Sequence, residues 1–153
     1  MLRGAKQFIA KVAARRVVPL ILFSVGGRPF AMKAHEVGGV EPWPVSMPMP
    51  GTTPHLRELV RRGESVYAVY DLAGQWSLTP DKATTLCMMV KWGTIEVAIR
   101  VDSQIPSLET AEVDMIRPVT DLQPGLIGRW THQGQDVPVV SFAHLDEHLR
   151  RAA

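Results

Sequence analysis

The stretch VPLILFSVGGRPFAMKA, residues 18–34, holds two short apolar runs on either side of a pair of glycines. Glycine adopts the backbone angles that a tight turn between antiparallel strands needs, so Gly26 and Gly27 predict a β-hairpin. The same pattern recurs in two later segments. They are TTLCMMVKWGTIEVAIRV, residues 84–101, with a turn at 92–94, and LIGRWTHQGQDVPVVSF, residues 126–142, with a turn at 133–135.

The segments between these hairpins complete the predicted strands. EPWPVSMPMPGTTP, residues 41–54, contains five prolines and predicts an extended connector that can serve as an edge strand. Residues 66–72 read as a strand buried on both faces, which fixes the basic turn before it as a recognition edge. In SFAHLDEHLRRAA, residues 141–153, Ser141 can cap a short terminal helix. Short strands at this spacing predict small barrels or a sandwich.

The composition is that of one globular domain. The chain has 153 residues, of which 46% are hydrophobic and 21% charged, and its formal net charge is +2. Five of the 17 basic residues lie in residues 1–16, so the remainder is slightly acidic, which argues against a surface that coats nucleic acid. We expect residues 1–16 to form a basic leader, helical or disordered, and residues 17–153 to form a single domain.

Several features bear on location. No apolar stretch reaches the roughly 18 to 20 residues that cross a bilayer, and the start lacks the pattern of a secretion signal. A single cysteine, Cys87, cannot form an internal disulfide and suits a reducing compartment. We therefore expect a cytoplasmic protein. In the leader, Leu2, Ile9 and Val12 are spaced for one helix face, and contact with an acidic membrane surface stays open beside a frayed lead-in.

No motif predicts an enzyme or a cofactor. HLDEH, residues 144–148, matches a zinc motif in which His144 and His148 are ligands, but no further ligand follows locally. Cys87 is flanked by apolar residues that disfavour a thiolate, and the chain contains no nucleophile elbow and no phosphate loop. A hydrolase that uses the histidine pair remains a rival hypothesis.

The four tryptophans raise the possibility of base stacking. Platforms for single-stranded nucleic acid combine exposed aromatic rings with a basic groove. Here each tryptophan lies near a turn, without a cluster of lysines beside it, which favours packing in the core or at its rim. A small-barrel nucleic-acid-binding module is therefore an alternative, not the favoured hypothesis. The four are Trp43, Trp76, Trp92 and Trp130.

The order of these segments resembles the CheW family of coupling proteins from about Pro19 to Leu149. FSVGGRPFAMKAHEVGGV, residues 23–40, is similar to the opening hairpin of the family. PHLRELVRRGESVYAVYDL, residues 54–72, is similar to the segment that carries an N-L-R-G turn. IEVAIRVDSQIPSLETAEVDMIRP, residues 95–118, and GRWTHQGQDVPVVSFAHLDEHL, residues 128–149, are similar to the later strands and the closing hairpin and helix.

The central turn departs from the family pattern. It reads VRRG at residues 60–63, so the Arg-Gly pair of the family falls on Arg62 and Gly63 with a shift of one residue. Glu58 stands where the family has glycine before the turn, and Ala68 replaces the usual proline of the strand. The resemblance therefore implies the fold more strongly than it implies each partner contact.

The resemblance implies an all-β fold of two intertwined five-stranded SH3-like β-barrel subdomains with a short C-terminal helix. It also implies a non-enzymatic adaptor, without cofactor or metal, that binds the regulatory domain of a CheA-type histidine kinase and the cytoplasmic tip of a chemoreceptor. Val37 would line the receptor-facing edge, Gly39 takes a position that the family often fills with an acid, and Asp102 matches a structural strand-end acid. The expected partner-binding residues are Val37, Gly39, Arg57, Glu58, Arg62 and Gly63.

We expect a cytoplasmic scaffold in bacterial chemosensory arrays at the inner membrane. The altered turn is compatible with an array other than the flagellar one, such as a type IV pilus system. Besides the nucleic-acid module and the hydrolase, a coupling-like protein that has lost one partner and acts as a competitor remains open. The sequence does not decide which receptor and kinase are bound.

Overall fold

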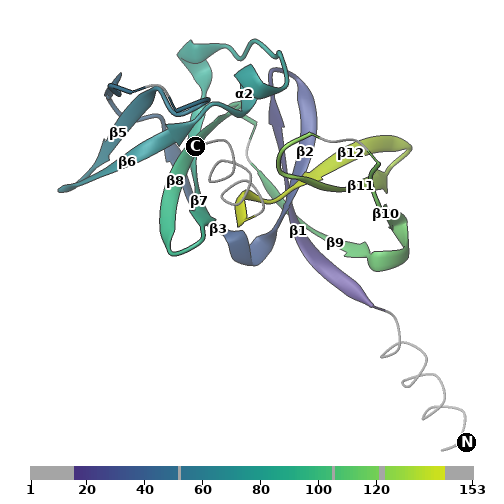
Figure 1. The fold of residues 1–153 in the computed structure, drawn as a ribbon. Coiled ribbons are helices and arrows are strands. Elements are labelled where there is room, and N and C mark those ends of the chain that lie inside the picture. The colour runs from purple at the N-terminus through teal and green to yellow at the C-terminus, as the bar shows by residue number, and fades with distance from the viewer. Residues whose placement is uncertain (1–15, 52, 105, 121–122, 144–153) are drawn as a thin grey trace, which may run out of the picture.

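The computed structural model describes residues 16–51, 53–104, 106–120 and 123–143. These residues form two β-sheets that are packed against each other (Figure 1). Most of the expected leader, residues 1–16, lies outside the described residues. So does the expected terminal helix beyond Ala143, together with His144 and His148.

The first sheet is built from both ends of the chain. Its strand order is β10-β11-β12-β2-β1-β9, and all neighbours are antiparallel except β12 and β2, which run parallel. Gly26 and Gly27 turn the first hairpin with positive φ angles, as the sequence predicted. The strands are β1 (Val17–Val25), β2 (Arg28–Lys33), β9 (Ser107–Glu112), β10 (Ile116–Arg117), β11 (Leu126–His132) and β12 (Gln135–Val140).

The second sheet comes from the middle of the chain. Its strand order is β3-β7-β8-β6-β5-β4, with β6 parallel to β8 and the other neighbours antiparallel. The proline-rich connector supplies the edge strand β4, which confirms the extended prediction for that segment. The strands are β3 (Val37–Pro42), β4 (Ser46–Pro48), β5 (Glu58–Arg62), β6 (Ser65–Tyr70), β7 (Leu86–Trp92) and β8 (Ile95–Val101).

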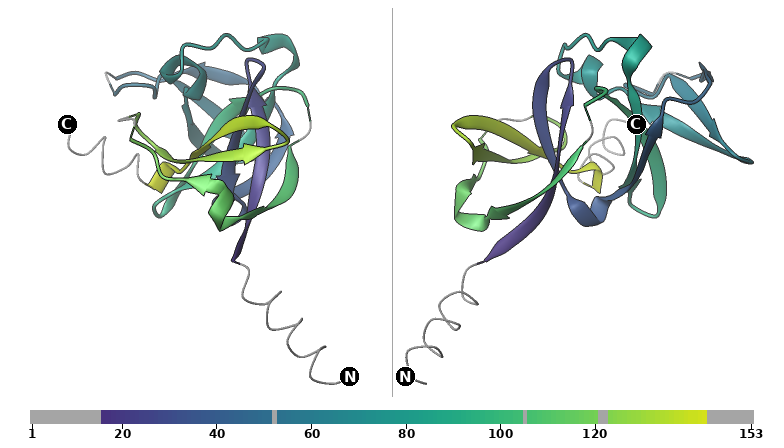
Figure 2. Two further views of the ribbon diagram at one scale, coloured as in Figure 1. Left: turned by 90° about the vertical axis from the view of Figure 1, so that its right-hand side faces the viewer. Right: turned by 180° about the vertical axis from the view of Figure 1, so that it is seen from behind.

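The two subdomains are intertwined because the chain leaves the first sheet after β2, builds the second sheet and then returns (Figure 2). The prediction of two β subdomains is confirmed. Each sheet has six strands in the described residues, instead of the five that we predicted. The short strands β4 and β10, which have three and two residues, are edge pairings that a sequence pattern does not resolve. Short helical segments join the strands: η1 (Ala34–Glu36), α2 (Leu72–Gln75), η2 (Lys82–Thr84) and η3 (Val113–Met115).

One apolar core lies between the subdomains. Phe23 and Phe30 of the first hairpin pack in the same cluster as Tyr70 and Trp92 of the second sheet. The ring of Phe142, just after β12, meets Tyr70 edge to face at a centroid distance of 5.0 Å. Such aromatic pairs add about 0.5–1.5 kcal/mol beyond the area that they bury. Each sheet also has a smaller core of its own, around Leu20 and Trp130 in the first and Val60 and Cys87 in the second.

The strand that we expected to be buried on both faces is buried only at its end. Val66 is 53% exposed, whereas Val69 and Tyr70 are 4% and 1% exposed. β6 pairs with β8 only at Val69 and Tyr70, so the rest of the β5–β6 hairpin extends beyond the body of the protein (Figure 1). The prediction was wrong because an apolar run does not reveal how far its neighbouring strands extend.

Asp102, at the end of β8, holds the first hairpin against the second sheet. Its carboxylate accepts hydrogen bonds from the backbone N–H groups of Gly26 and Gly27, at 2.9 and 2.8 Å, and from the hydroxyl of Ser24, at 2.9 Å. Its own backbone N–H donates to the carbonyl of Ser24. These contacts join residues more than 70 positions apart, which supports the structural role expected for Asp102.

We predict that Asp102→Ala lowers the free energy of unfolding by about 2–3 kcal/mol, because three donors lose a charged acceptor. Urea denaturation measures the change. Asp81→Ala is the matched control, since exposed Asp81 accepts only the N–H of Ala83 among the hydrogen bonds found for its side chain in the described residues. Its expected loss is about 0.5–1 kcal/mol, in the range of a weak cap. Equal losses in both variants would contradict the role of Asp102.

Candidate functional site

The residues that the sequence singled out lie on two strands of the second sheet. Val37 and Gly39 belong to β3, Glu58 begins β5, and Arg62 ends it. In the strand order, β7, β8 and β6 separate β3 from β5. Even so, the end of β5 that carries Arg62 and Gly63 lies beside β3, where Arg62 contacts Glu41, whereas Arg57 and Glu58 lie at the other end of β5.

Arg62 is held by an acid that the sequence analysis did not select. Its Nε donates to Oε1 of Glu41 on β3 at 2.6 Å, and its guanidinium carbon lies 6.0 Å from the centroid of the Tyr67 ring. The hydrogen bond to Glu41 is the main cause that raises the pKa of Arg62. Both side chains remain about one-third exposed, so the pair sits at the surface and fixes the direction of the guanidinium.

The family resemblance points to position 39, so Glu41 was not among the predicted site residues. The resemblance places an acid at position 39, and the acid that meets Arg62 lies two residues further along β3. Side chains two residues apart on a strand share a face, so Glu41 lies on the same side of β3 as position 39. The signal was present, because Glu41 is the only acid among residues 37–42.

Gly63 forms the turn of the β5–β6 hairpin. Its φ angle is +60°, a conformation that glycine adopts without strain, and a Cβ added there would meet nothing within 4 Å. The side chain of Arg61 folds over the turn and donates from Nε to the carbonyl of Gly63 at 3.0 Å. The basic turn is therefore a structured tip, and a shallow hollow beside it is lined by Glu41, Pro42, Pro44, Arg61, Arg62, Gly63 and Tyr67.

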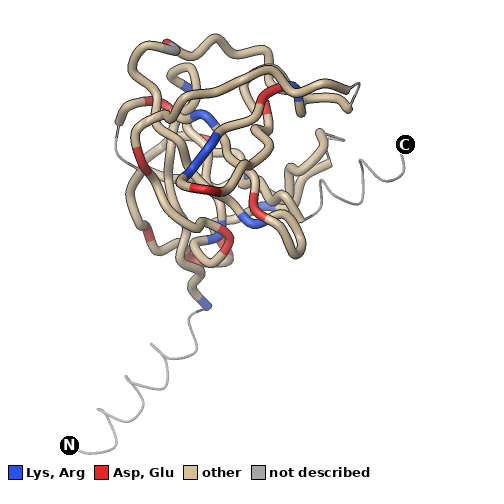
Figure 3. Tube along the Cα trace, turned by 90° about the vertical axis from the view of Figure 1, so that its left-hand side faces the viewer, with Lys and Arg blue, Asp and Glu red and all other residues tan. Residues whose placement is uncertain are grey.

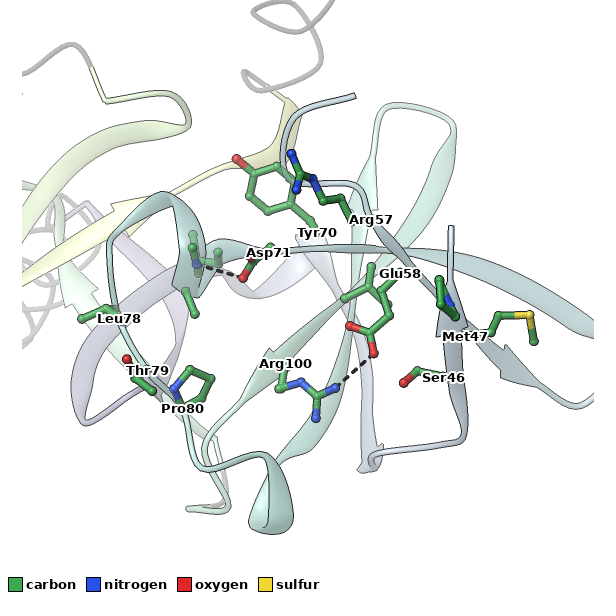
Figure 4. Close-up of a pocket in the computed structure, with 15 residues that line it drawn as sticks. Ser46, Met47, Arg57, Glu58, Tyr70, Asp71, Leu78, Thr79, Pro80 and Arg100 are labelled. Carbon is green, nitrogen blue, oxygen red and sulfur yellow. Dashed lines mark hydrogen bonds and ion pairs between the residues drawn. The ribbon is translucent and has the colours of Figure 1, made fainter. Parts of the chain in front are cut away.

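The other end of β5 borders a groove of ≈ 550 Å³, with β4 on one side and α2 and the loop at residues 78–80 on the other (Figure 4). Glu58 pairs with Nη2 of Arg100 at 3.2 Å. Arg100 also donates to the Thr85 hydroxyl at 2.9 Å and stacks over the Trp43 ring at 3.7 Å. Glu58 thus belongs to a network that holds the second sheet together, whereas Arg57 is exposed at the groove.

The wall of the groove connects the two subdomains. Asp71 caps α2 by accepting the N–H of Gly74 at 2.8 Å. The Tyr70 hydroxyl donates to Oε1 of Gln75 at 2.5 Å, and Nε2 of Gln75 donates to the carbonyl of Pro124 at 2.6 Å. Burial raises the pKa of Tyr70. This wall is therefore fixed by contacts that reach from β6 to the segment before β11.

Val37 lies partly in the core and partly at the surface of β3. It is half-buried and packs against the core between the subdomains, next to the buried residue Glu36. The Glu36 carboxylate accepts a hydrogen bond of 2.7 Å from the hydroxyl of Ser141, which ties η1 to the end of the last strand. Val37 contributes to folding as well as to the surface of β3, whose residue Val40 is 42% exposed.

The tryptophans pack instead of forming a platform. Trp76, Trp92 and Trp130 are buried, and Trp43 is half-buried beneath the guanidinium of Arg100. This confirms the expectation that they belong to the core and its rim. Within the described part of the chain, no three His, Cys, Asp or Glu residues are grouped as metal ligands, and none of the helices there is long and apolar enough to cross a membrane.

Comparison with known proteins assigns the fold and the family. The model of the CheW-like domain family matches residues 19–148. The chain belongs to the CheW-like domain family. A solved structure, the scaffolding protein TtCheW from Thermoanaerobacter tengcongensis, aligns with a TM-score of 0.73 at 12% sequence identity, over 85% of this chain and 92% of that one. A comparison with curated protein sequences gave no match.

This CheW-like membership confirms the family resemblance and the twin β architecture. CheW-like proteins form a non-enzymatic scaffolding family in chemotaxis signalling, and this chain is a scaffold of that kind. Cys87 fits such a protein, because it is fully buried and burial raises the pKa of its thiol to about 11. The partner contacts of Val37, Gly39, Arg57, Glu58, Arg62 and Gly63 stay predictions.

We predict that Cys87 resists alkylation in the folded protein. With a pKa of about 11, only about one thiol in a thousand is ionised at pH 8, and the side chain has no exposed surface. Iodoacetamide labelling at pH 8, followed by mass spectrometry, should be at least about 100-fold slower than for the urea-unfolded chain. Labelling of the native protein at the rate of the unfolded one would contradict the burial of Cys87.

We predict a small favourable coupling between Arg62 and Glu41. A double-mutant cycle with Arg62→Ala, Glu41→Ala and both together should give about 0.3–1 kcal/mol in urea denaturation, because the pair is partly exposed. The coupling should shrink in 1 M salt, which screens exposed charges. A cycle that closes with zero coupling at low salt would mean that the two side chains are not paired in solution.

Proposed function

We propose that this CheW-like protein couples a chemoreceptor to a CheA-type histidine kinase in the bacterial cytoplasm, at receptor arrays on the inner membrane. The observation that carries the proposal is the projecting β5–β6 hairpin with Arg62 fixed by Glu41 at its tip. A scaffold must offer surfaces that are already ordered before the partner arrives, since ordering side chains on binding costs affinity.

The hairpin tip suits the regulatory domain of the kinase. Arg62 keeps about one-third of its side chain exposed, so it can contact an acidic or carbonyl-rich partner while Glu41 directs it. Exposed Val66 offers apolar area on the same hairpin, and the Tyr67 ring supports the guanidinium. An arginine beside aromatic and apolar surface is a common composition of an interface anchor.

The receptor side of the proposal rests on β3. Val37 and Val40 present partly exposed apolar surface, and a Cβ added at Gly39 would meet nothing within 4 Å, which leaves room for a partner side chain there. The exposed Arg57 lies away from this strand, at the groove beside β4. We assign Val37 and Gly39 to the receptor and Arg62 and Gly63 to the kinase, with Arg57 and Glu58 as flanking residues.

The altered VRRG turn, residues 60–63, extends the proposal to arrays other than the flagellar one. Arg62 and Gly63 match the family turn only with a shift of one residue, and Arg62 is paired with Glu41 on β3. A kinase domain that recognises this tip must match that change. We therefore propose a dedicated kinase, such as that of a type IV pilus system.

We predict that Arg62→Ala weakens binding to the regulatory domain of the cognate CheA-type kinase by about 5- to 150-fold, the range of a moderate anchor of about 1–3 kcal/mol. Isothermal titration with the purified kinase domain measures the affinity. Val37→Asp should weaken capture of the receptor tip and leave kinase binding within twofold, because a charge is placed in an apolar contact.

Arg117→Ala is the matched control for Arg62→Ala. Arg117 is also an exposed arginine paired with an acid, Asp136, but it lies on the first sheet. It should retain kinase affinity within twofold. Equal weakening by both substitutions would refute the assignment of the hairpin tip. Loss of the native circular dichroism in Val37→Asp would refute the assignment of Val37 to receptor binding, because core packing would then explain its effect.

A further inference from the structure

One apolar face of the first sheet has no cover in the described residues. β1 and β9 pair with Val17 opposite Glu112, Pro19 opposite Thr110 and Ile21 opposite Leu108. Side chains at every second position of a strand share a face, so these six lie on the same side of the β1–β9 ribbon. The alternate residues, among them Leu20 and Ala111, point into the small core of the first sheet.

The same face of β1 is covered at one end and uncovered at the other. Phe23 and Val25, further along the strand, are buried in the core between the subdomains. The beginning of β1 extends past the second sheet (Figures 1 and 2). Val17 is consequently 53% exposed and Leu108 67% exposed, although both are apolar.

The turn η3 follows β9 directly and adds exposed apolar and acidic residues next to this face. Val113 and Met115 are 40% and 43% exposed, and Asp114 between them is exposed as well. Residues 107–115 contain three acids and no basic residue, with Glu112 on the uncovered face and Glu109 on the other. We call Val17, Leu108, Val113, Asp114 and Met115 the acidic apolar face. It would suit a segment that is both basic and apolar.

The chain itself supplies such a segment at this place. Residues 1–16 contain five basic residues and no acid, with Leu2, Ile9 and Val12 at helical spacing. The backbone N–H of Val113 donates to the carbonyl of Arg16 at 3.0 Å, so residues 1–15 join the body directly beside η3. Charge, apolar content and point of attachment all match the face.

The length also fits. From Val113 back to Leu108, the strand spans about 17 Å at about 3.3 Å per residue. Fifteen residues reach about 22 Å as a helix and more when extended. We propose that residues 1–15 dock within the same chain on the acidic apolar face. Val12 would lie near Val113 and Leu2, about 15 Å further along a helix, near Leu108, with the basic residues near Asp114.

This docking would give the leader a role that is separate from receptor and kinase coupling. β9 is the outer strand of its sheet in the described residues, and an uncovered edge invites pairing with other chains. A docked leader shields that edge and its apolar face, and any partner that uses the face must displace it. The inference stands or falls independently of the proposed function, because its test needs neither kinase nor receptor.

The test is a disulfide between the leader and the face in the chain of residues 1–153. Leu2→Cys combined with Leu108→Cys should close an intrachain bond under mild oxidation, because docking brings the two positions near the Cα separation that a disulfide requires. Gel mobility without reductant follows the reaction. Leu2→Cys with Ile95→Cys is the matched control, since Ile95 is 60% exposed but lies next to the β7–β8 turn of the second sheet. Buried Cys87 does not compete.

We expect the Leu108 pair to close at least tenfold faster than the Ile95 pair, and 1 M salt or Asp114→Lys to reduce this advantage. Equal rates would overturn the proposal, and so would a bond that forms only between two chains. Hydrogen exchange provides a second readout: Ile9→Asp with Val12→Asp should accelerate exchange in β9. If β9 exchanges unchanged while vesicles of anionic lipid capture the wild-type chain, the leader binds membranes instead of the face.

Discussion

The apolar core between the two subdomains determines which surfaces the protein can present. Phe23 and Phe30 from the first hairpin, Tyr70 and Trp92 from the second sheet, and Phe142 after the last strand meet in one cluster. Because the second sheet is inserted between β2 and β9, neither subdomain completes this core without the other. The contact fixes their relative position, so the edges on the outside, including β3 and the β5–β6 hairpin, have fixed positions as well. For a scaffold that holds two partners, this rigidity avoids an entropic cost at each binding event.

Local features of the fold could be predicted from the sequence, and features set by distant contacts could not. Gly26 with Gly27 and Gly134 sit in turns between apolar runs, so those hairpins were predictable. The burial of β6 was not, because it depends on Val69 and Tyr70 alone pairing with β8. At the candidate site, Arg62 was selected from its motif, but its partner Glu41 is 21 residues away. Arg100, which pairs with Glu58, and Trp43, whose ring lies under Arg100, come from two other segments and belong to no site motif.

The paired arginines of the second sheet differ in how many of their donors are used inside the protein. Arg100 is the most buried of the paired ones, with 14% of its side chain exposed, and its contacts to Glu58, Thr85 and Trp43 are all internal. A guanidinium so engaged has few donors left for a partner. Arg62 makes one charged contact and keeps a third of its side chain in solvent, which leaves donors free to point outward. The same residue type therefore stabilises the fold at one end of β5 and, at the other end, has donors left for the kinase contact that we propose.

The free edges of the two sheets are protected in different ways. β4 is short and lies among Pro44, Pro48 and Pro50, and proline offers no N–H to an added strand. β9 has six residues and no proline, so its outer backbone groups keep the capacity to pair. The acidic residues of β9 repel an added strand only in part, because Leu108 on the same strand is apolar and mostly exposed. A sheet that has no proline at this edge needs another cover, and the basic, apolar segment that enters the body beside Val113 is the one whose composition matches.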